Sequence, residues 1–417
     1  MTDHALFSAS GAKGWMTCAA KLAMESDLPN RESSYAQQGT LAHQLAETCL
    51  TTQTLPYHYL GQKLVPEIDM EVDQEMVSEV RKYIDYVMDL RKHHAGDDLV
   101  FHVEERVDYS DSIGQDDSFG TSDVLLLAGE DAHVVDLKYG QGVEVYAEHN
   151  PQGMLYALGL LERYGLSYDI KRVTIHIVQP RKNHFDSWTC EVDELLAFAQ
   201  EAKDRASLAR DMLDIGKPRI LAEFDRFEDS FAPTEEACRW CRAKATCPAL
   251  EREVARTVSF GNDATLDDFT EDYVDAVPHA NADRLGAIMD RVDLLLMFIK
   301  AVETEAAART TAGDPPVGAD GPYKFVEGRK GARAWLNEAE AEALLKSFRL
   351  KTDEMYNYKL ISPTQAAKVL ESSPQRWAKA QALIGQADGK PKLVKGSDKK
   401  PAIQVAISAD DFTDDAD

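Results

Sequence analysis

The stretch from Phe119 to Tyr156 constrains the fold more than any other part of the 417-residue chain. It holds two runs of aliphatic and β-branched residues, FGTSDVLLL and AHVVDLKYG, separated by a short turn of glycine and acidic residues. This pattern predicts a β-hairpin. The segment NPQGMLYALGLLERYG that follows predicts a helix, because its apolar residues recur on one stripe. The stretch therefore predicts strand, strand and helix in that order.

Three charged residues lie on the two predicted strands. Asp123 is on the first strand, and Asp136 and Lys138 are on or just beyond the second. Side chains alternate faces along a strand, so Asp136 and Lys138 point the same way. Burying an unpaired charge is costly, so such a pair indicates either a strand-end salt bridge or a chemical site. A D-x-K triplet alone favours the salt bridge. Motifs elsewhere in the chain are needed to choose between the salt bridge and a chemical site.

Further apolar patterns predict the elements around the hairpin. Residues 37–50 predict a helix that begins at Thr40 and carries His43 and Glu47 on one face, four residues apart. The other predicted elements are an amphipathic helix at 70–94, strands at 99–110, 173–181 and 186–192, and a helix at 192–214. Strands and helices in this order predict an α/β fold.

The cysteines indicate a metal site. Six are present, at Cys18, Cys49, Cys190, Cys238, Cys241 and Cys247. The last three form a C-x2-C-x5-C pattern, which brings two thiolates to one centre with a third close by. In a cytosolic chain this pattern indicates metal binding before a disulfide. A fourth ligand is needed, and each of the three remaining cysteines is a candidate.

Composition limits the partners. The net charge of −26 argues weakly against nucleic acid, because phosphate binding favours Lys and Arg. Net charge does not describe a local cleft, however, and carboxylates that bind metal also add to the negative count. No apolar run approaches the roughly 20 residues that span a membrane, and no secretory signal precedes the first element. We therefore expect a cytoplasmic protein with no membrane partner.

The chain beyond residue 258 differs from the preceding part in its predicted elements and in its charge pattern. Residues 259–400 predict a mainly helical region, with one long helix at 283–310 and short helices capped by Asn337 and Ser362. This region could grip DNA or support oligomerisation. A basic patch near its end either tracks phosphates or belongs to a solvated linker; its residues are Lys390, Lys392, Lys395, Lys399 and Lys400. Residues 401–417 predict an acidic, disordered tail.

The motifs occur in a fixed order along the chain. An N-terminal Cys is followed by G-T-x-x-H-x-x-x-E, G-T-x-D, D-x-K, Q-x-x-x-Y and C-x2-C-x5-C. This order resembles the PD-(D/E)XK nuclease superfamily in its RecB-like branch. More narrowly, residues 8–250 resemble its iron–sulfur exonucleases, the AddB nuclease domain and the CRISPR-adaptation exonucleases. The whole chain is similar to a family of phage and prophage proteins.

The resemblance implies a PD-(D/E)XK restriction-endonuclease-like core in residues 1–258, a mixed central sheet flanked by helices. It implies that Mg²⁺ or Mn²⁺ is held by His43, Asp123, Asp136 and the Leu137 carbonyl, donors that suit these hard cations. Asp136 stands where many relatives have Glu, which the RecB-like branch tolerates.

The remaining motif residues take their roles from the same resemblance. Lys138 would position or activate the attacking water. Gln152 and Tyr156 would brace the site and contact DNA, and Glu47 would lie beside the metal ligands. A 4Fe–4S cluster would be held by four cysteines, which are Cys18, Cys238, Cys241 and Cys247.

The expected function is a metal-dependent DNA exonuclease acting on DNA ends in phage recombination. Its partners would be single- or double-stranded DNA ends and a phage single-strand annealing or single-strand-binding protein. One alternative is an endonuclease or structure-specific nuclease of the same superfamily. Another is a non-catalytic DNA-binding recombination scaffold with a degenerate site, but the intact His43, Asp123, Asp136 and Lys138 argue against it. The four cysteines could also hold Zn²⁺ instead of an iron–sulfur cluster.

Overall fold

The structure is a computed structural model of the full chain. It describes residues 5–29, 34–94, 99–258, 282–328, 334–356, 360–385, 392–394 and 400–403. The chain divides into two compact units, Met1–Val302 and Glu303–Asp411. The first unit extends beyond residue 258, the predicted end of the nuclease domain. Most of the predicted acidic tail lies outside the described residues, as do Lys390, Lys395 and Lys399 of the basic patch.

The first unit is built on one five-stranded sheet, which confirms the α/β prediction. Its strands are β1 (Val100–Asp108), β2 (Phe119–Ala128), β3 (Asp131–Leu137), β4 (Arg172–Gln179) and β5 (His184–Glu191). They lie in sequence order in the sheet. All neighbours are antiparallel except β3 and β4, which are parallel and are joined through helix α6 (Pro151–Tyr164). A parallel pair requires such a crossover connection, so α6 is placed against the sheet by the topology itself.

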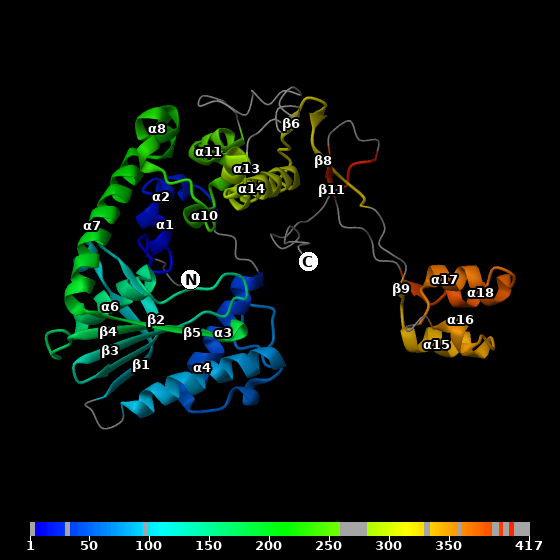
Figure 1. Ribbon diagram of the computed structural model, residues 1–417, viewed down its shortest axis with the longest axis horizontal. Helices are drawn as coiled ribbons and strands as arrows, with labels where there is room; N and C mark the ends of the chain where they lie inside the picture. The colour runs from blue at the N-terminus through cyan, green and yellow to red at the C-terminus, as the bar shows by residue number, and fades with distance from the viewer. Residues whose placement is uncertain are drawn as a thin grey trace. The chain divides into compact units, whose positions relative to one another are not determined.

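Helices cover both faces of this sheet (Figure 1). Helices α3 (Ser34–Thr52) and α4 (Gln74–His93) pack on one face, against Val135 and Leu137 of β3. Helices α6 and α7 (Val192–Ile215) pack on the other face, against Val134. Odd and even residues of β3 therefore serve different cores, as strand alternation requires.

The first unit also contains a series of mostly short helices. They are α1 (Ala12–Thr17), α2 (Lys21–Glu25), η1 (Pro56–Tyr59), α5 (Ser110–Ile113), η2 (Pro180–Lys182), α8 (Lys217–Ala222), α9 (Phe224–Phe227), η3 (Glu228–Ser230), α10 (Glu235–Cys238), η4 (Lys244–Thr246), α11 (Pro248–Val258) and α13 (Ala282–Met289). Helix α14 (Val292–Thr311) crosses the division between the units. Within the described residues, no helix combines the length and apolarity that crossing a membrane requires.

The second unit is a set of short elements. They are β6 (Val317–Gly318), β7 (Gly321–Pro322), β8 (Lys324–Val326), β9 (Ala334–Trp335), α15 (Glu338–Ser347), α16 (Thr352–Met355), α17 (Pro363–Val369), α18 (Pro374–Gln381), β10 (Ile384–Gly385) and β11 (Lys392–Val394). The strands form two-stranded pairs, and the helices enclose a small apolar core around Leu345 and Leu370.

Two predictions of helix boundaries were wrong. Helix α3 begins at Ser34, and the Thr40 hydroxyl donates to the Ala36 carbonyl inside the helix instead of capping it. The single helix predicted at 283–310 is two helices, α13 and α14, separated at Asp290 and Arg291. After the break, Leu294 packs with Leu250 of α11, so tertiary packing has overridden a continuous helical pattern.

Candidate functional site

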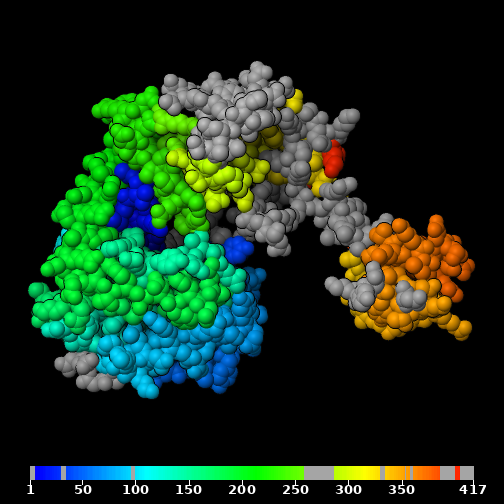
Figure 2. Space-filling model, in the orientation of Figure 1, coloured from blue at the N-terminus to red at the C-terminus, as the bar shows by residue number. Residues whose placement is uncertain are grey.

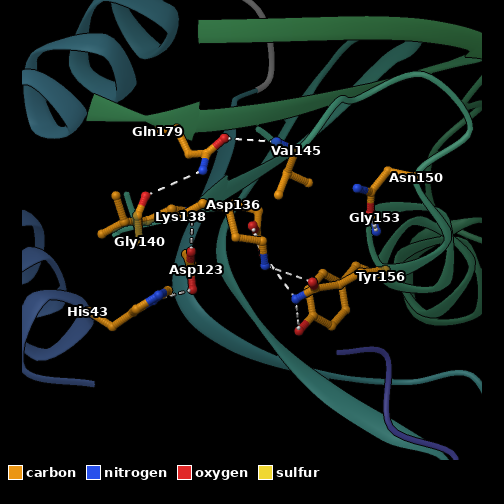
Figure 3. A network of polar contacts seen from close by, with 12 residues as sticks. His43, Asp123, Asp136, Lys138, Gly140, Val145, Asn150, Gly153, Tyr156 and Gln179 are labelled. Carbon is orange, nitrogen blue, oxygen red and sulfur yellow. Dashed lines mark hydrogen bonds and ion pairs between the residues drawn. The ribbon is translucent and has the colours of Figure 1, made fainter. Parts of the chain in front are cut away.

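The candidate site lies where strands β2 and β3 separate. Their pairing ends at Val124 and Val135, so Asp123 and Asp136 are the first residues beyond the paired segment. Helix α3 brings His43 to this point, and α6 brings Gln152 from the opposite face of the sheet. Figure 3 shows the side chains of His43, Asp123 and Asp136 close together. The fold therefore brings together residues from β2, β3, α3 and α6 at the end of the β2–β3 pairing.

Asp123 is held from two sides. Its Oδ1 lies 3.0 Å from His43 Nδ1, and its Oδ2 accepts a 2.6 Å hydrogen bond from the Leu137 backbone N–H. Burial opposes charging of His43, but the carboxylates of Asp123 and Asp136 outweigh burial and raise the pKa of His43 to about 9. The carboxylates of Asp123 and Asp136 therefore stabilise a positive charge at the position of the His43 ring.

Glu104 is a site residue that the sequence analysis missed. His43, Glu104 and Asp123 each offer one ligand atom, and these three atoms lie within 4.8 Å of one another. Burial, reinforced by the charge of Asp123, raises the pKa of Glu104 to about 8. The available signal in the sequence was the pair Glu104 and Glu105, which interrupts the alternation of β1.

The backbone of Glu104 explains how its side chain reaches the site. In the β1–β2 ladder, Val103 pairs with Val124 and Glu105 pairs with Ser122, which leaves Glu104 opposite Asp123 without a ladder pairing. Glu104 has a φ of +52°, in the left-handed region that side chains other than glycine seldom adopt. Such outliers persist where the surrounding structure holds them, and they cluster at functional sites.

Asp136 and Lys138 form a second, adjoining set with Gln152. Lys138 Nζ lies 2.8 Å from Asp136 Oδ2 and donates a 2.7 Å hydrogen bond to Gln152 Oε1. Gln152 Nε2 donates to Asp136 Oδ1 at 3.0 Å and to the Tyr156 hydroxyl at 3.1 Å. Burial raises the pKa of Asp136, and the charge of Lys138 opposes this. Asp136 Oδ2 is buried and pairs with the Lys138 ammonium, but it accepts no hydrogen bond of good geometry from the described residues.

The predicted metal ligands are therefore only partly gathered. His43 and Asp123 are together, while Asp136 is outside their 4.8 Å group and is engaged by Lys138 and Gln152. The Leu137 amide reaches Asp123. Glu47 accepts a hydrogen bond from Gln44 on its own helix, at 2.7 Å, and is also outside the group.

Two further residues shape the site. A Cβ atom at Gly120 would lie 2.6 Å from the ring of Tyr156, so the glycine of the G-T-x-D motif makes room for this ring. Buried Gln179 secures the loop after Lys138: its side chain accepts a 2.9 Å hydrogen bond from the Val145 amide and donates to the Val143 carbonyl at 2.8 Å. Figure 3 shows the Gln179 side chain, at the end of β4, directed toward Gly140 and Val145 of this loop. The sequence analysis missed Gln179 too.

The cysteines of the predicted metal centre line one small pocket. Cys18 lines it together with Cys238, Cys241 and Cys247. The other two candidates for the fourth ligand lie elsewhere, Cys49 in the core beneath α3 and α4 and Cys190 in the core beneath α6 and α7. Burial raises the pKa of Cys238 to about 12, and the neighbouring thiols reinforce the shift. Thiolates at these positions therefore need a metal to compensate their charge.

The spacing of these sulfur atoms bears on the kind of metal. Four thiolates around one Zn²⁺ would lie about 3.8 Å apart, given tetrahedral bonds of about 2.3 Å. Among the described cysteines, no three sulfur atoms come within 4.8 Å of one another. In this conformation the thiols are therefore too far apart for a single zinc ion. The sulfur atoms are not gathered around one centre, so the kind of group that they would hold stays a prediction.

Comparison with known proteins gives the family. A family model described as "Protein of unknown function (DUF2800)" matches residues 4–401, so the chain belongs to this family. No solved structure matches the chain.

Proposed function

We propose that this DUF2800 protein is a metal-dependent deoxyribonuclease with a PD-(D/E)XK core of the RecB-like branch. Exonucleolytic cleavage at DNA ends, in phage recombination or end processing, is the favoured activity. The observation that carries the proposal is the meeting of His43, Glu104 and Asp123 within 4.8 Å, with the ion pair of Asp136 and Lys138 beside them. Carboxylates, an imidazole and a lysine in one small space are the groups that phosphodiester hydrolysis requires.

The donor set fits Mg²⁺ or Mn²⁺. His43, Glu104 and Asp123 would hold the ion, and Asp136 would join them once its carboxylate turns from Lys138. A bound divalent ion would supply Lewis-acid polarisation of the phosphate and a more acidic water. The carboxylates around His43 raise its pKa to about 9, so a bound cation would have to displace its proton before the imidazole could act as a ligand.

Lys138 would be the group that meets the scissile phosphate. Its ammonium lies 2.8 Å from Asp136, and Gln152 holds it from α6 by a 2.7 Å hydrogen bond. From there it would orient the attacking water and stabilise the charge that develops on the phosphate. Gln152 and Tyr156 would act through Asp136 and Lys138, as positioning residues.

The four cysteines would hold a 4Fe–4S cluster. They connect α1 at the start of the first unit with α10 and α11 more than 200 residues later. Such a cluster would supply cohesion between these distant segments. Visible absorbance with stoichiometric iron would distinguish it from a colourless zinc protein.

The chain contains its own control for the nuclease test. Asp169 and Lys171 form a second D-x-K triplet, ion-paired like Asp136 and Lys138, but both residues are exposed before β4 and away from the site. The assay uses end-labelled linear single- and double-stranded DNA with Mg²⁺ or Mn²⁺. We expect Asp136→Ala and Lys138→Ala to reduce cleavage by at least about 100-fold, the scale of losing transition-state stabilisation. Asp169→Ala and Lys171→Ala should leave it unchanged.

Cleavage that survives both Asp136→Ala and Lys138→Ala would refute the site assignment. Absence of metal-dependent cleavage by the wild type on every substrate would refute the nuclease itself and favour a DNA-binding scaffold. Closed circular DNA separates the two nuclease alternatives, because only an endonuclease cuts a substrate without ends. The ladder of products from each labelled end gives the polarity.

A further inference from the structure

A cleft of about 2680 Å³ connects the candidate site with the segment that carries the cysteines. His43 and Lys138 line one part of it, and Arg239, Trp240 and Arg242 line another. All of its lining residues belong to the first unit. In Figure 2 the blue N-terminal residues, which also line the cleft, lie recessed between green surfaces of the later helices. A binding partner in the cleft would therefore touch both the site and the cysteine segment.

Three strongly exposed aromatic residues line this cleft. They are Trp240, which is 80% exposed, Tyr35 at 66% and Tyr146 at 58%. They come from three separate elements: the C-x-x-C turn, α3 and the loop after β3. Large rings that line a cleft and stay in contact with water are available to a molecule bound there. Although the Trp240 ring is exposed, its backbone is held in place, because its carbonyl accepts a 3.4 Å hydrogen bond from the Lys21 ammonium.

The charge of the cleft differs from that of the whole protein. Seven Lys or Arg residues and seven Glu residues line it, a balance that contrasts with the net charge of −26 for the chain. Several of the basic side chains are already in ion pairs, among them Lys13 with Glu236 and Arg239 with Glu235. The cleft therefore tolerates phosphates without attracting them strongly. Affinity for a nucleic acid would have to come largely from its bases.

We propose that the cleft holds single-stranded DNA and that the Trp240 ring stacks on one of its bases. Aromatic rings stack on any unpaired base, whereas the faces of bases in a duplex are covered by their neighbours. Tyr35 lies eight residues before His43 on α3, about 12 Å along the helix axis, so it would meet the strand a few nucleotides from the site. This inference rests on the proposed deoxyribonuclease function and specifies its substrate as an unpaired strand.

The test measures binding in EDTA, where metal-dependent cleavage is suppressed. The full-length protein is titrated with a short oligothymidylate and with an abasic deoxyribose-phosphate strand of equal length. We expect the wild type to prefer the thymidylate strand. Trp240→Leu should bind thymidylate roughly 5- to 100-fold more weakly, the range for loss of one base–aromatic stack, and should bind the abasic strand unchanged. Trp240→Phe, which keeps a ring, should retain most of the preference.

Tyr57→Ala is the matched control, because Tyr57 is also 57% exposed but does not line the cleft. Visible absorbance and the thermal midpoint of each variant show that the cysteine centre beside Trp240 is intact. Equal thymidylate affinity in wild type and Trp240→Leu would overturn the stacking inference alone. A wild type that binds a duplex of equal length but neither single strand would overturn the inference of an unpaired substrate. A wild type that binds none of the three would overturn the deoxyribonuclease proposal as well, so the two failures are distinguishable.

Discussion

Glu104 combines an unfavourable backbone with a chemically significant position. A residue other than glycine held in the left-handed region costs about 1–3 kcal/mol, and Glu104 has a φ of +52° in the middle of β1. The conformation directs its carboxylate toward His43 and Asp123, where burial raises its pKa to about 8. Both the strain and the buried carboxylate are unfavourable in the isolated protein. A bound cation would relieve the second.

Glu104→Gln tests this assignment at the scale of one residue. We expect at least about 10- to 100-fold weaker Mn²⁺ binding, the loss that follows removal of an outer-shell partner of a metal, because the amide lacks the charge of a direct ligand. Isothermal titration calorimetry measures the affinity directly, without reference to cleavage. Glu105→Gln is the control, since Glu105 is adjacent in sequence but pairs with Arg163. Equal affinity of both variants for Mn²⁺ would remove Glu104 from the site.

At the scale of elements, the closeness of α6 to the sheet positions Gln152 and Tyr156. A Cβ atom at Gly159 of α6 would lie 2.7 Å from the Val107 Cβ and 2.9 Å from the Asp108 carbonyl oxygen. Because a backbone oxygen cannot move aside cheaply, glycine is what permits this approach. In contrast, a Cβ atom at Gly39 of α3 would meet nothing within 4 Å.

The same substitution in these two helices should have opposite effects on stability. Gly159→Ala should lower the free energy of unfolding by about 1–3 kcal/mol through overpacking. Gly39→Ala should raise it by about 0.5–1 kcal/mol, because glycine is a poor helix former. Urea unfolding followed by circular dichroism measures both changes. Stabilisation by Gly159→Ala would show that α6 is not held tightly against β1.

Local patterns predicted most elements because the information lies within a few residues. The hairpin of β2 and β3 and the caps at Asn337 and Ser362 follow from such patterns, and the structure contains them. Glu104 could not be predicted in the same way. Its role depends on a backbone outlier and on the approach of α3, which contributes His43 from 61 residues earlier in the chain.

For the candidate site, too, the sequence predicted some features and not others. The D-x-K spacing predicted that Asp136 and Lys138 share a face, and their ion pair is observed. It did not distinguish them from Asp169 and Lys171, which have the same spacing but are exposed. Burial beside α6 separates the two triplets, and burial is a property of the tertiary structure.

At the scale of the whole molecule, buried histidines couple stability to pH. His133 and His176 lie between the sheet and α4, with His133 Nδ1 at 3.0 Å from His176 Nε2 and the Tyr86 hydroxyl at 2.7 Å from His176 Nδ1. Burial, assisted by the nearby His94, lowers the pKa of His133 to about 4. Burial and the neighbouring His133 lower the pKa of His176 to about 3. Both rings are therefore neutral in the folded protein at neutral pH.

The sign of the pH effect follows from these directions. Between pH about 6.5 and 4 the unfolded chain binds protons at these histidines and the folded protein does not, so stability falls as pH falls. One such histidine contributes a slope of about 1.4 kcal/mol per pH unit. We expect His133→Asn to flatten the pH dependence of the urea-unfolding free energy by about this amount. Exposed His58 provides the control in His58→Asn, and parallel curves for wild type and His133→Asn would contradict the expectation.

The hydrogen bond from the Leu137 amide to Asp123 makes one backbone proton a reporter on the site. This amide follows Asp136 and precedes Lys138, and its acceptor is a carboxylate oxygen that also belongs to the proposed ligand set. If Asp123 coordinates a cation, the hydrogen bond from the Leu137 amide to its carboxylate must weaken or change direction. The ¹⁵N–¹H resonance of Leu137 should therefore report the occupancy of the site from inside the sheet, without a substrate or a change of sequence.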